Sequence, residues 1–177
     1  MRLTPRVLRP ALLAALLAAS ALAQGPSEPA PVIRNGVSFV MAQDLVKVSV
    51  QNGVRAEQFI QSPSAVQAGD ILREQVTVRN VRGQTIAQVT VGIPIPRETV
   101  FSGGVTPNSS RWTVAYSADG GRTYSPRPMQ DVTVTENGKS VTRSQPAPPE
   151  SYTHVRWTVA GLRKDETLKL EFRVRVR

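Results

Sequence analysis

Residues 168–177 read LKLEFRVRVR, and their pattern decides the fold. Apolar residues alternate with charged residues at every second position from Leu168 to Arg177. A period of two places successive side chains on opposite faces of a β-strand, so one face of this segment is apolar and the other is charged. Such a strand is typical of an antiparallel sheet that buries one face and leaves the other in water.

The same alternation recurs along the chain, and helical spacing is nearly absent. Five further segments carry apolar residues on one strand face, namely 46–50, 72–78, 89–93, 112–116 and 155–159. Two more strands are predicted on either side of Asn137-Gly138, because this pair adopts the positive φ values that a two-residue hairpin turn needs. Short strands without intervening helices predict an all-β fold, an immunoglobulin-like antiparallel β-sandwich of seven to nine strands. A closed barrel is the alternative, since the pattern does not show whether the last strand pairs with the first.

The N-terminal stretch has the features of a secretory signal peptide. Arg2, Arg6 and Arg9 precede a short run of alanine and leucine, and small residues end it at Ala21 and Ala23. We predict a signal peptide over residues 1–23, a proline-rich tether over 24–36 and the β-sandwich domain over 37–177. No later segment is apolar enough to span a membrane as a helix. Export leaves three locations open: the periplasm, the cell surface and the medium.

The composition bounds the kind of protein that this chain can form. The sequence has 177 residues, a formal net charge of +9 and no cysteine. Its length suits one domain with a core of its own. Because there are no cysteines to form disulfides, stability has to come from apolar burial and backbone hydrogen bonds.

One motif raises the question of catalysis. Residues 117–125 read SADGGRTYS, which resembles the Asp-box of sialidases and related β-propellers. In that motif the carboxylate accepts backbone hydrogen bonds across a turn, which makes it a structural element. We therefore interpret it as a hairpin brace, with strand 112–116 leading in and residues 122–124 leading out. The residues of the brace are Ser117, Asp119, Gly121, Thr123 and Tyr124.

The sequence favours a protein without catalytic activity. A glycosidase needs two carboxylates that converge on one cleft, and no pair in this chain has a persuasive placement. His154 is the only histidine and falls on the outward face of its predicted strand, so a serine–histidine–acid set is not expected. The same scarcity of histidine and cysteine argues against a zinc site. We predict no cofactor, no metal and no enzymatic activity.

Basic residues on the last two strands suggest an alternative function. If segments 155–159 and 168–176 pair, their outward cations form one basic face that attracts an anionic envelope polymer or glycan. Nucleic acid is not expected, because no aromatic residues alternate with the arginines to stack on bases. The candidate residues are Arg156, Lys169, Arg173, Arg175 and Arg177.

Several landmarks over residues 63–177 resemble a known family. They are Val66-Gln67-Ala68-Gly69-Asp70, the segment Glu74–Asn80, Ile93-Pro94-Ile95-Pro96, Arg156-Trp157-Thr158-Val159 and the closing strand Leu168–Val176. Together they resemble the bacterial conserved-repeat surface domain called domain of unknown function 11. The resemblance implies an immunoglobulin-like sandwich in exported or cell-envelope proteins, often in tandem arrays. This chain departs from the family at Ala68, where proline is common, and at Lys164-Asp165-Glu166.

Taken together, the sequence predicts an exported, non-catalytic β-sandwich module of the cell envelope or surface. Its expected mode of action is structural or protein–protein contact. The expected partners are envelope proteins or an anionic envelope polymer, and the sequence leaves the oligomeric state open.

Overall fold

The computed structural model describes residues 29–136 and 138–177, and this part of the chain is all-β. The signal peptide predicted at residues 1–23 lies outside the described residues. A single turn of 3-10 helix, η1, spans Pro149–Ser151. The strands are β1 Val32–Arg34, β2 Val37–Gln51, β3 Val54–Gln61, β4 Ile71–Asn80, β5 Val89–Pro94, β6 Thr99–Gly103, β7 Trp112–Ser117, β8 Met129–Glu136, β9 Lys139–Pro146, β10 His154–Val159 and β11 Thr167–Val176.

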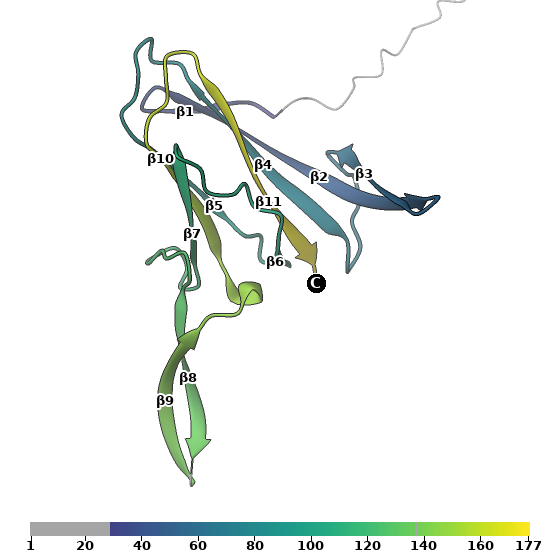
Figure 1. Ribbon diagram of the computed structural model, residues 1–177, viewed down its shortest axis with the longest axis vertical. Helices are drawn as coiled ribbons and strands as arrows, with labels where there is room; N and C mark the ends of the chain where they lie inside the picture. The colour runs from purple at the N-terminus through teal and green to yellow at the C-terminus, as the bar shows by residue number, and fades with distance from the viewer. Residues whose placement is uncertain (1–28, 137) are drawn as a thin grey trace, which may run out of the picture.

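Two antiparallel sheets face each other across the core. The larger sheet has the strand order β1-β2-β4-β11-β6, with β3 paired to the free side of β2. The smaller sheet has the order β5-β10-β7. In Figure 1 the two sheets approach each other at the top of the molecule and diverge toward the bottom. The predicted sandwich is confirmed, and no strand pairing among the described residues joins the two sheets into a closed barrel.

The core consists of the apolar strand faces that the sequence pattern predicted. In β11, Leu170, Phe172 and Val174 are fully buried, while Lys169 just before them and Arg175 just after them are exposed. Trp157 of β10 is also fully buried, and its indole N–H donates to the backbone oxygen of Thr106 at 3.1 Å. The opposite sheet faces meet at these side chains, so burial of one face of each strand holds the two layers together.

The last two strands do not pair with each other, so the condition for a single basic face is not met. The strand β10 lies in the smaller sheet, between β5 and β7, whereas β11 lies in the larger sheet, between β4 and β6. The turn between them crosses from one layer to the other. Alternation shows which side of a strand is buried, but it does not show which sheet the strand joins.

The last residues of the predicted tether are part of the sheet. Val32–Arg34 forms β1, which pairs with the start of β2 through the turn Asn35-Gly36. Asn35 and Gly36 have φ values of 50° and 77°, as a two-residue hairpin turn requires. The turn Asn52-Gly53 joins β2 to β3 in the same way, with φ values of 51° and 78°. Because the residues just before β1 are rich in proline, the sequence predicted a tether up to residue 36 and not the first of these hairpins.

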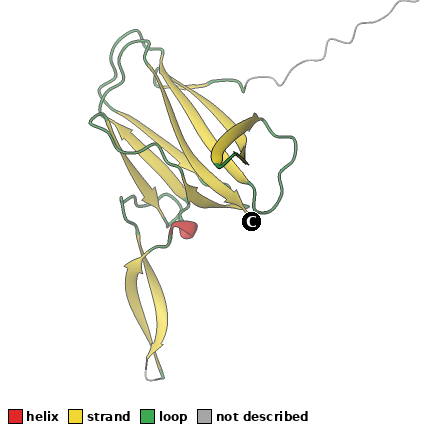
Figure 2. Ribbon diagram, turned by 45° about the vertical axis from the view of Figure 1, so that its right-hand side comes forward, coloured by secondary structure: helices red, strands yellow, loops and turns green. Residues whose placement is uncertain are grey.

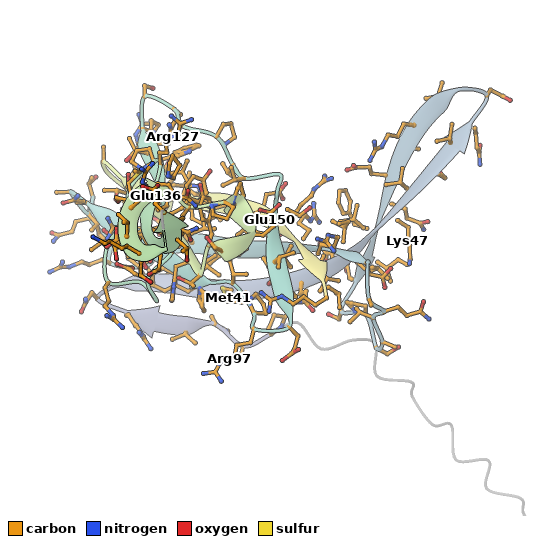
Figure 3. All side chains as sticks on the ribbon, turned by 90° about the horizontal axis from the view of Figure 1, so that it is seen from below. Met41, Lys47, Arg97, Arg127, Glu136 and Glu150 are labelled. Atoms are coloured by element: carbon orange, nitrogen blue, oxygen red, sulfur yellow. The ribbon has the colours of Figure 1, made fainter. Side chains whose placement is uncertain are left out.

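Two hairpins extend beyond the sandwich. The far end of β2 pairs only with β3, and this arm curves away from the body on the side of Lys47 (Figure 3). The other hairpin consists of β8 and β9, which pair with each other and with no other described strand. Figures 1 and 2 show this second hairpin projecting from the bottom of the molecule. Its turn was predicted at Asn137-Gly138, of which the structure describes Gly138, with a φ of 75°.

Candidate functional site

The Asp119 turn is held by a dense set of hydrogen bonds. Its carboxylate accepts the backbone N–H groups of Arg122 and Thr123 at 3.0–3.1 Å and the hydroxyl of Thr123 at 2.6 Å. The hydroxyl of Ser117 donates to it as well, at 2.7 Å, and accepts the N–H of Gly121 at 2.9 Å. The hydrogen bonds from Thr123 and Ser117 hold the pKa of Asp119 well below its usual range. The charged carboxylate therefore serves to hold the turn together.

The segment that follows this turn differs from the predicted returning strand. Residues 122–124 form no strand, and a single bridge joins Tyr116 to Ser125. Tyr124 instead lies on the outer face of the smaller sheet, where the guanidinium of Arg156 is 3.8 Å from the centre of its ring. Its hydroxyl lies close to Gly121 and Gly92, so neighbouring glycines make room for the ring. The aromatic residue of the motif thus fastens the turn to the sheet.

The structure does not bring the predicted basic residues together. Arg156 lies on the outer face of the smaller sheet, and the outward residues of β11 lie on the outer face of the larger one. These two faces point in opposite directions because both inner faces meet at the core. Arg177 follows β11, and its backbone N–H donates to the carbonyl oxygen of Glu98. The single basic face expected from the sequence is therefore absent.

Acidic side chains neutralise much of the outward row of β11. Arg173 forms two hydrogen bonds to the carboxylate of Glu57 in β3, at 2.9 and 2.6 Å, and these bonds lower the pKa of Glu57. Arg73 of β4 bonds to Asp44 and lies 3.5 Å from Glu171. These ion pairs link the β3 arm and β2 to the body, which is a structural role.

An apolar groove lies between the sheets on the β1 side of the sandwich. It has a volume of about 620 Å³. Residues of β1, β2 and β4 line one side of it, and a continuous run of residues, 88–93, lines the other. Among the described residues that line it, Arg34 is the one with a charge. Two apolar residues of this lining remain well exposed, since Met41 is 44% and Val32 53% accessible. In the described part of the chain, none of the three strands of the smaller sheet covers β1 and the outer part of β2.

One wall of the groove is the open edge of β5. In the part of the chain that the structure describes, β5 pairs with β10 alone. Just beyond the strand, the N–H of Ile95 donates to the carbonyl oxygen of Thr153 at 2.8 Å. Because the bonding side alternates along an antiparallel strand, odd-numbered residues of β5 face β10. Thr90 and Gly92 therefore direct their backbone N–H and C=O groups toward the open side.

The β8–β9 hairpin presents two chemically different faces. One face, called here the valine face, consists of Gln130, Val132, Val134, Glu136, Lys139, Val141, Arg143 and Gln145. The other, called the hydroxyl face, consists of Asp131, Thr133, Thr135, Ser140, Thr142 and Ser144. All residues of β9 are exposed, and those of β8 are at most half-buried. A salt bridge of 2.6 Å between Arg143 and Glu136 is an exposed pair that stabilises the hairpin little.

Sequence reasoning missed the groove, and it predicted the β8–β9 hairpin without showing that the hairpin stands apart from the two sheets. The valines at 132 and 134 look identical to those of a packed strand, and only the fold shows that no second layer covers them. The groove has a weak signal in Asn35-Gly36, because a hairpin at this point extends the larger sheet past the end of the smaller one.

The structure also bears on metal binding and on membrane-spanning helices. Within residues 29–136 and 138–177, no three histidine, cysteine or acidic side chains gather as a metal site would need. Over the same residues, the structure contains no helix with the length and apolar character to cross a membrane. Comparisons with protein-family models, with curated proteins and with solved structures gave no match to this chain. The resemblance to the conserved-repeat surface domain therefore stays a prediction.

Proposed function

We propose that this chain is an exported module of the cell envelope or surface that acts by contact rather than by catalysis. We propose further that the β8–β9 hairpin makes the contact. Support for export comes from the N-terminal sequence, with its basic start, short apolar run and small residues before Gln24.

The observation that carries the proposal is the projection of the β8–β9 hairpin. A two-stranded hairpin that packs on nothing is marginally stable in water, because it buries little apolar surface. Its two outer edges carry backbone groups that no described strand pairs with. Extended edges of this kind bind other chains by strand addition. Because the hairpin adds little buried apolar surface to the core of its own chain, it is best explained as a binding element.

A sedimentation experiment with isolated cell envelopes tests the proposal. The full sequence is expressed, and the protein is purified in the form that the cell produces. We expect wild-type protein to sediment with envelopes and Val134→Lys to lose at least about tenfold in retention, the equivalent of roughly 1.4 kcal/mol. Thr133→Lys adds the same charge to the hydroxyl face of the same strand and is the matched control.

A second pair of variants separates contact through the hairpin from attraction to a polyanion. Arg173→Glu and Arg175→Glu change charges on the outer face of the larger sheet. The proposal expects these variants to keep their retention, with little dependence on salt. If they lost it while Val134→Lys did not, the hairpin would be the wrong element. Turnover of glycosides or esters by the purified protein, lost on changing Asp119 or His154, would contradict the non-catalytic role.

A further inference from the structure

We propose that the groove beside β5 is the receptor for the β8–β9 hairpin of a second copy of this chain. This inference rests on the proposed function, since it assumes that the hairpin is the contact element, and it names the partner. The strand β8 of one copy would add to the open edge of β5 in the next copy. Its valine face would then cover the exposed apolar residues of β1 and β2.

The number of strands in each layer is the first argument. The path through the larger sheet has five strands, β1-β2-β4-β11-β6, and the smaller sheet has three. Two strands would fill the uncovered part of the sandwich, and the hairpin supplies two strands that belong to no layer. Its own copy cannot donate it, because the hairpin points away from the body, at the end opposite β1 (Figure 1).

Backbone hydrogen bonding is the second argument. Thr90 and Gly92 direct their N–H and C=O groups into the groove, and strand addition pairs such groups with an incoming strand. The outer edge of β8 is likewise unpaired, since β9 occupies only its other edge. Both partners therefore have matching edges, and β8, with eight residues, is long enough to cover β5, with six.

Apolar and charged residues give the third argument. Val132 and Val134 are two residues apart on one face of β8, which matches the groove floor that Phe39 and Met41 form at the same spacing on β2. The strand β8 carries Asp131 and Glu136 and no basic residue, whereas β9 carries Lys139 and Arg143 and no acidic one. Of these acidic residues, Glu136 lies on the valine face, where its exposed pair with Arg143 stabilises the hairpin little and can be exchanged for a pair with Arg34, the one charged residue among the described residues that line the groove.

The position of Arg34 also sets the direction of the incoming strand. Arg34 pairs with Val37, and Val37 pairs with Asn80, whose side chain donates to the carbonyl oxygen of Leu162. Leu162 in turn bridges to Ile86, just before β5 begins. Glu136 meets Arg34 at this end only if β8 runs antiparallel to β5. An antiparallel arrangement matches every other strand pair in the structure.

Such a contact uses two different surfaces, so it joins copies head to tail. Each copy then offers a free groove at one end and a free hairpin at the other, and assembly continues until a ring closes or the supply of copies ends. If the groove is blocked in one variant and the hairpin in another, a mixture of the two can form only one kind of contact. The hairpin of the groove-blocked variant binds the groove of the hairpin-blocked variant.

A mixing experiment with two variants tests the inference. Met41→Lys places a charge in the groove, and Val134→Lys places one on the valine face. Ile33→Lys and Thr133→Lys are the matched controls, because Ile33 is exposed outside the groove lining and Thr133 lies on the hydroxyl face. Molar mass is measured by light scattering over a range of concentrations, and circular dichroism with thermal melting checks that each variant is folded.

We expect the molar mass of the wild type and both controls to rise with concentration, and both blocked variants to remain monomers. An equimolar mixture of the blocked variants should form a dimer of one copy of each that does not grow further. A wild type that stays monomeric up to about 1 mM, where even a weak site of about −4 kcal/mol is half occupied, would overturn the inference. A mixture that stays monomeric, or a Val134→Lys variant that assembles like the wild type, would overturn it too.

The outcomes separate this inference from the proposed function. Loss of envelope retention by Val134→Lys with a strictly monomeric wild type would leave the hairpin as the contact element and refute the second copy as its partner. Formation of the mixed dimer with unchanged envelope retention by Val134→Lys would support the hairpin-in-groove contact and refute the hairpin as the envelope contact.

Discussion

The carboxylate of Asp119 shows how a single side chain can organise a turn. Four protein groups donate hydrogen bonds to it, from Ser117, Arg122 and Thr123. Because these donors favour the charged form, the pKa of Asp119 in the folded protein lies well below the ordinary value of about 3.9. Its contribution to stability is therefore present above the ordinary pKa and is lost as the pH falls through the lower folded-state value.

We predict that Asp119→Asn lowers the free energy of unfolding at neutral pH, because the amide nitrogen replaces one acceptor oxygen. The difference from the wild type should be constant above about pH 5 and should shrink below about pH 4. Urea denaturation at several pH values measures it. Asp165→Asn, which removes an exposed carboxylate of the same type, is the control and should give a small difference. A difference for Asp119→Asn that does not change in acid would contradict the assigned role.

Glu74 presents the opposite electrostatic situation. It faces the core from β4, is 6% exposed, and accepts a hydrogen bond from the side-chain amide of Gln43 at 2.6 Å. Burial raises the pKa of Glu74, because the charged form is poorly solvated there. A raised pKa in an acid means that its contribution to stability is greatest in acid and is lost as the pH rises through the folded-state value.

We predict that Glu74→Gln raises the midpoint of thermal unfolding at pH 8 relative to the wild type and has a smaller effect at pH 4. Glutamine preserves the shape and the bond to Gln43 and removes the charge. Differential scanning calorimetry at the two pH values measures the change. A variant less stable than the wild type at pH 8 would show that the charged form of Glu74 is stabilised by its surroundings.

At the scale of elements, the two hairpin turns that contain Gly36 and Gly138 should respond differently to substitution. Both glycines have positive φ values, 77° and 75°, which are unfavourable for alanine. A Cβ on Gly36 would also lie 2.8 Å from the Cβ of Arg82, whereas nothing lies within 4 Å of one on Gly138. We predict that Gly36→Ala lowers the free energy of unfolding by at least about 1–2 kcal/mol.

Gly138→Ala should instead leave the global unfolding transition almost unchanged, because the β8–β9 hairpin can open without the body. Hydrogen exchange measured by mass spectrometry checks this directly. We expect the amides of β8 and β9 to exchange far faster than those of β4 and β11, and faster still in Gly138→Ala. Equal protection of the hairpin and the central strands in a monomeric sample would contradict an independent hairpin.

The elements also show where sequence reasoning succeeded and where it did not. Period two identified the strands that bury one face, such as 168–176 and 155–159. It could not identify β3, whose residues are all exposed, or the short β6, which begins with three buried residues in succession. Nor could it assign strands to sheets, so it left open whether β10 and β11 pair, and the structure places them in different sheets. The hairpin brace was placed at the right residues, but its returning strand was not.

At the scale of the whole molecule, stability depends on one core without disulfides. Phe172 is fully buried and contacts residues of both layers, with its ring centre 6.3 Å from those of Trp157 and Phe101. We predict that Phe172→Ala lowers the free energy of unfolding by about 3–5 kcal/mol, since it leaves a cavity at the centre. Urea denaturation followed by tryptophan fluorescence measures the loss. The exposed Val50→Ala serves as the control and should cost well under 1 kcal/mol.

The place of β11 in the larger sheet has a consequence for the order of events in the cell. Of the described strands, β11 is made last, yet it lies between β4 and β6 and joins them. While the ribosome is still adding these residues, β4 has no neighbour on that side and the sheet cannot close. If the chain is exported as we propose, the missing β11 ladder keeps the larger sheet open while the chain passes through a translocation channel, and folding finishes on the far side of the membrane.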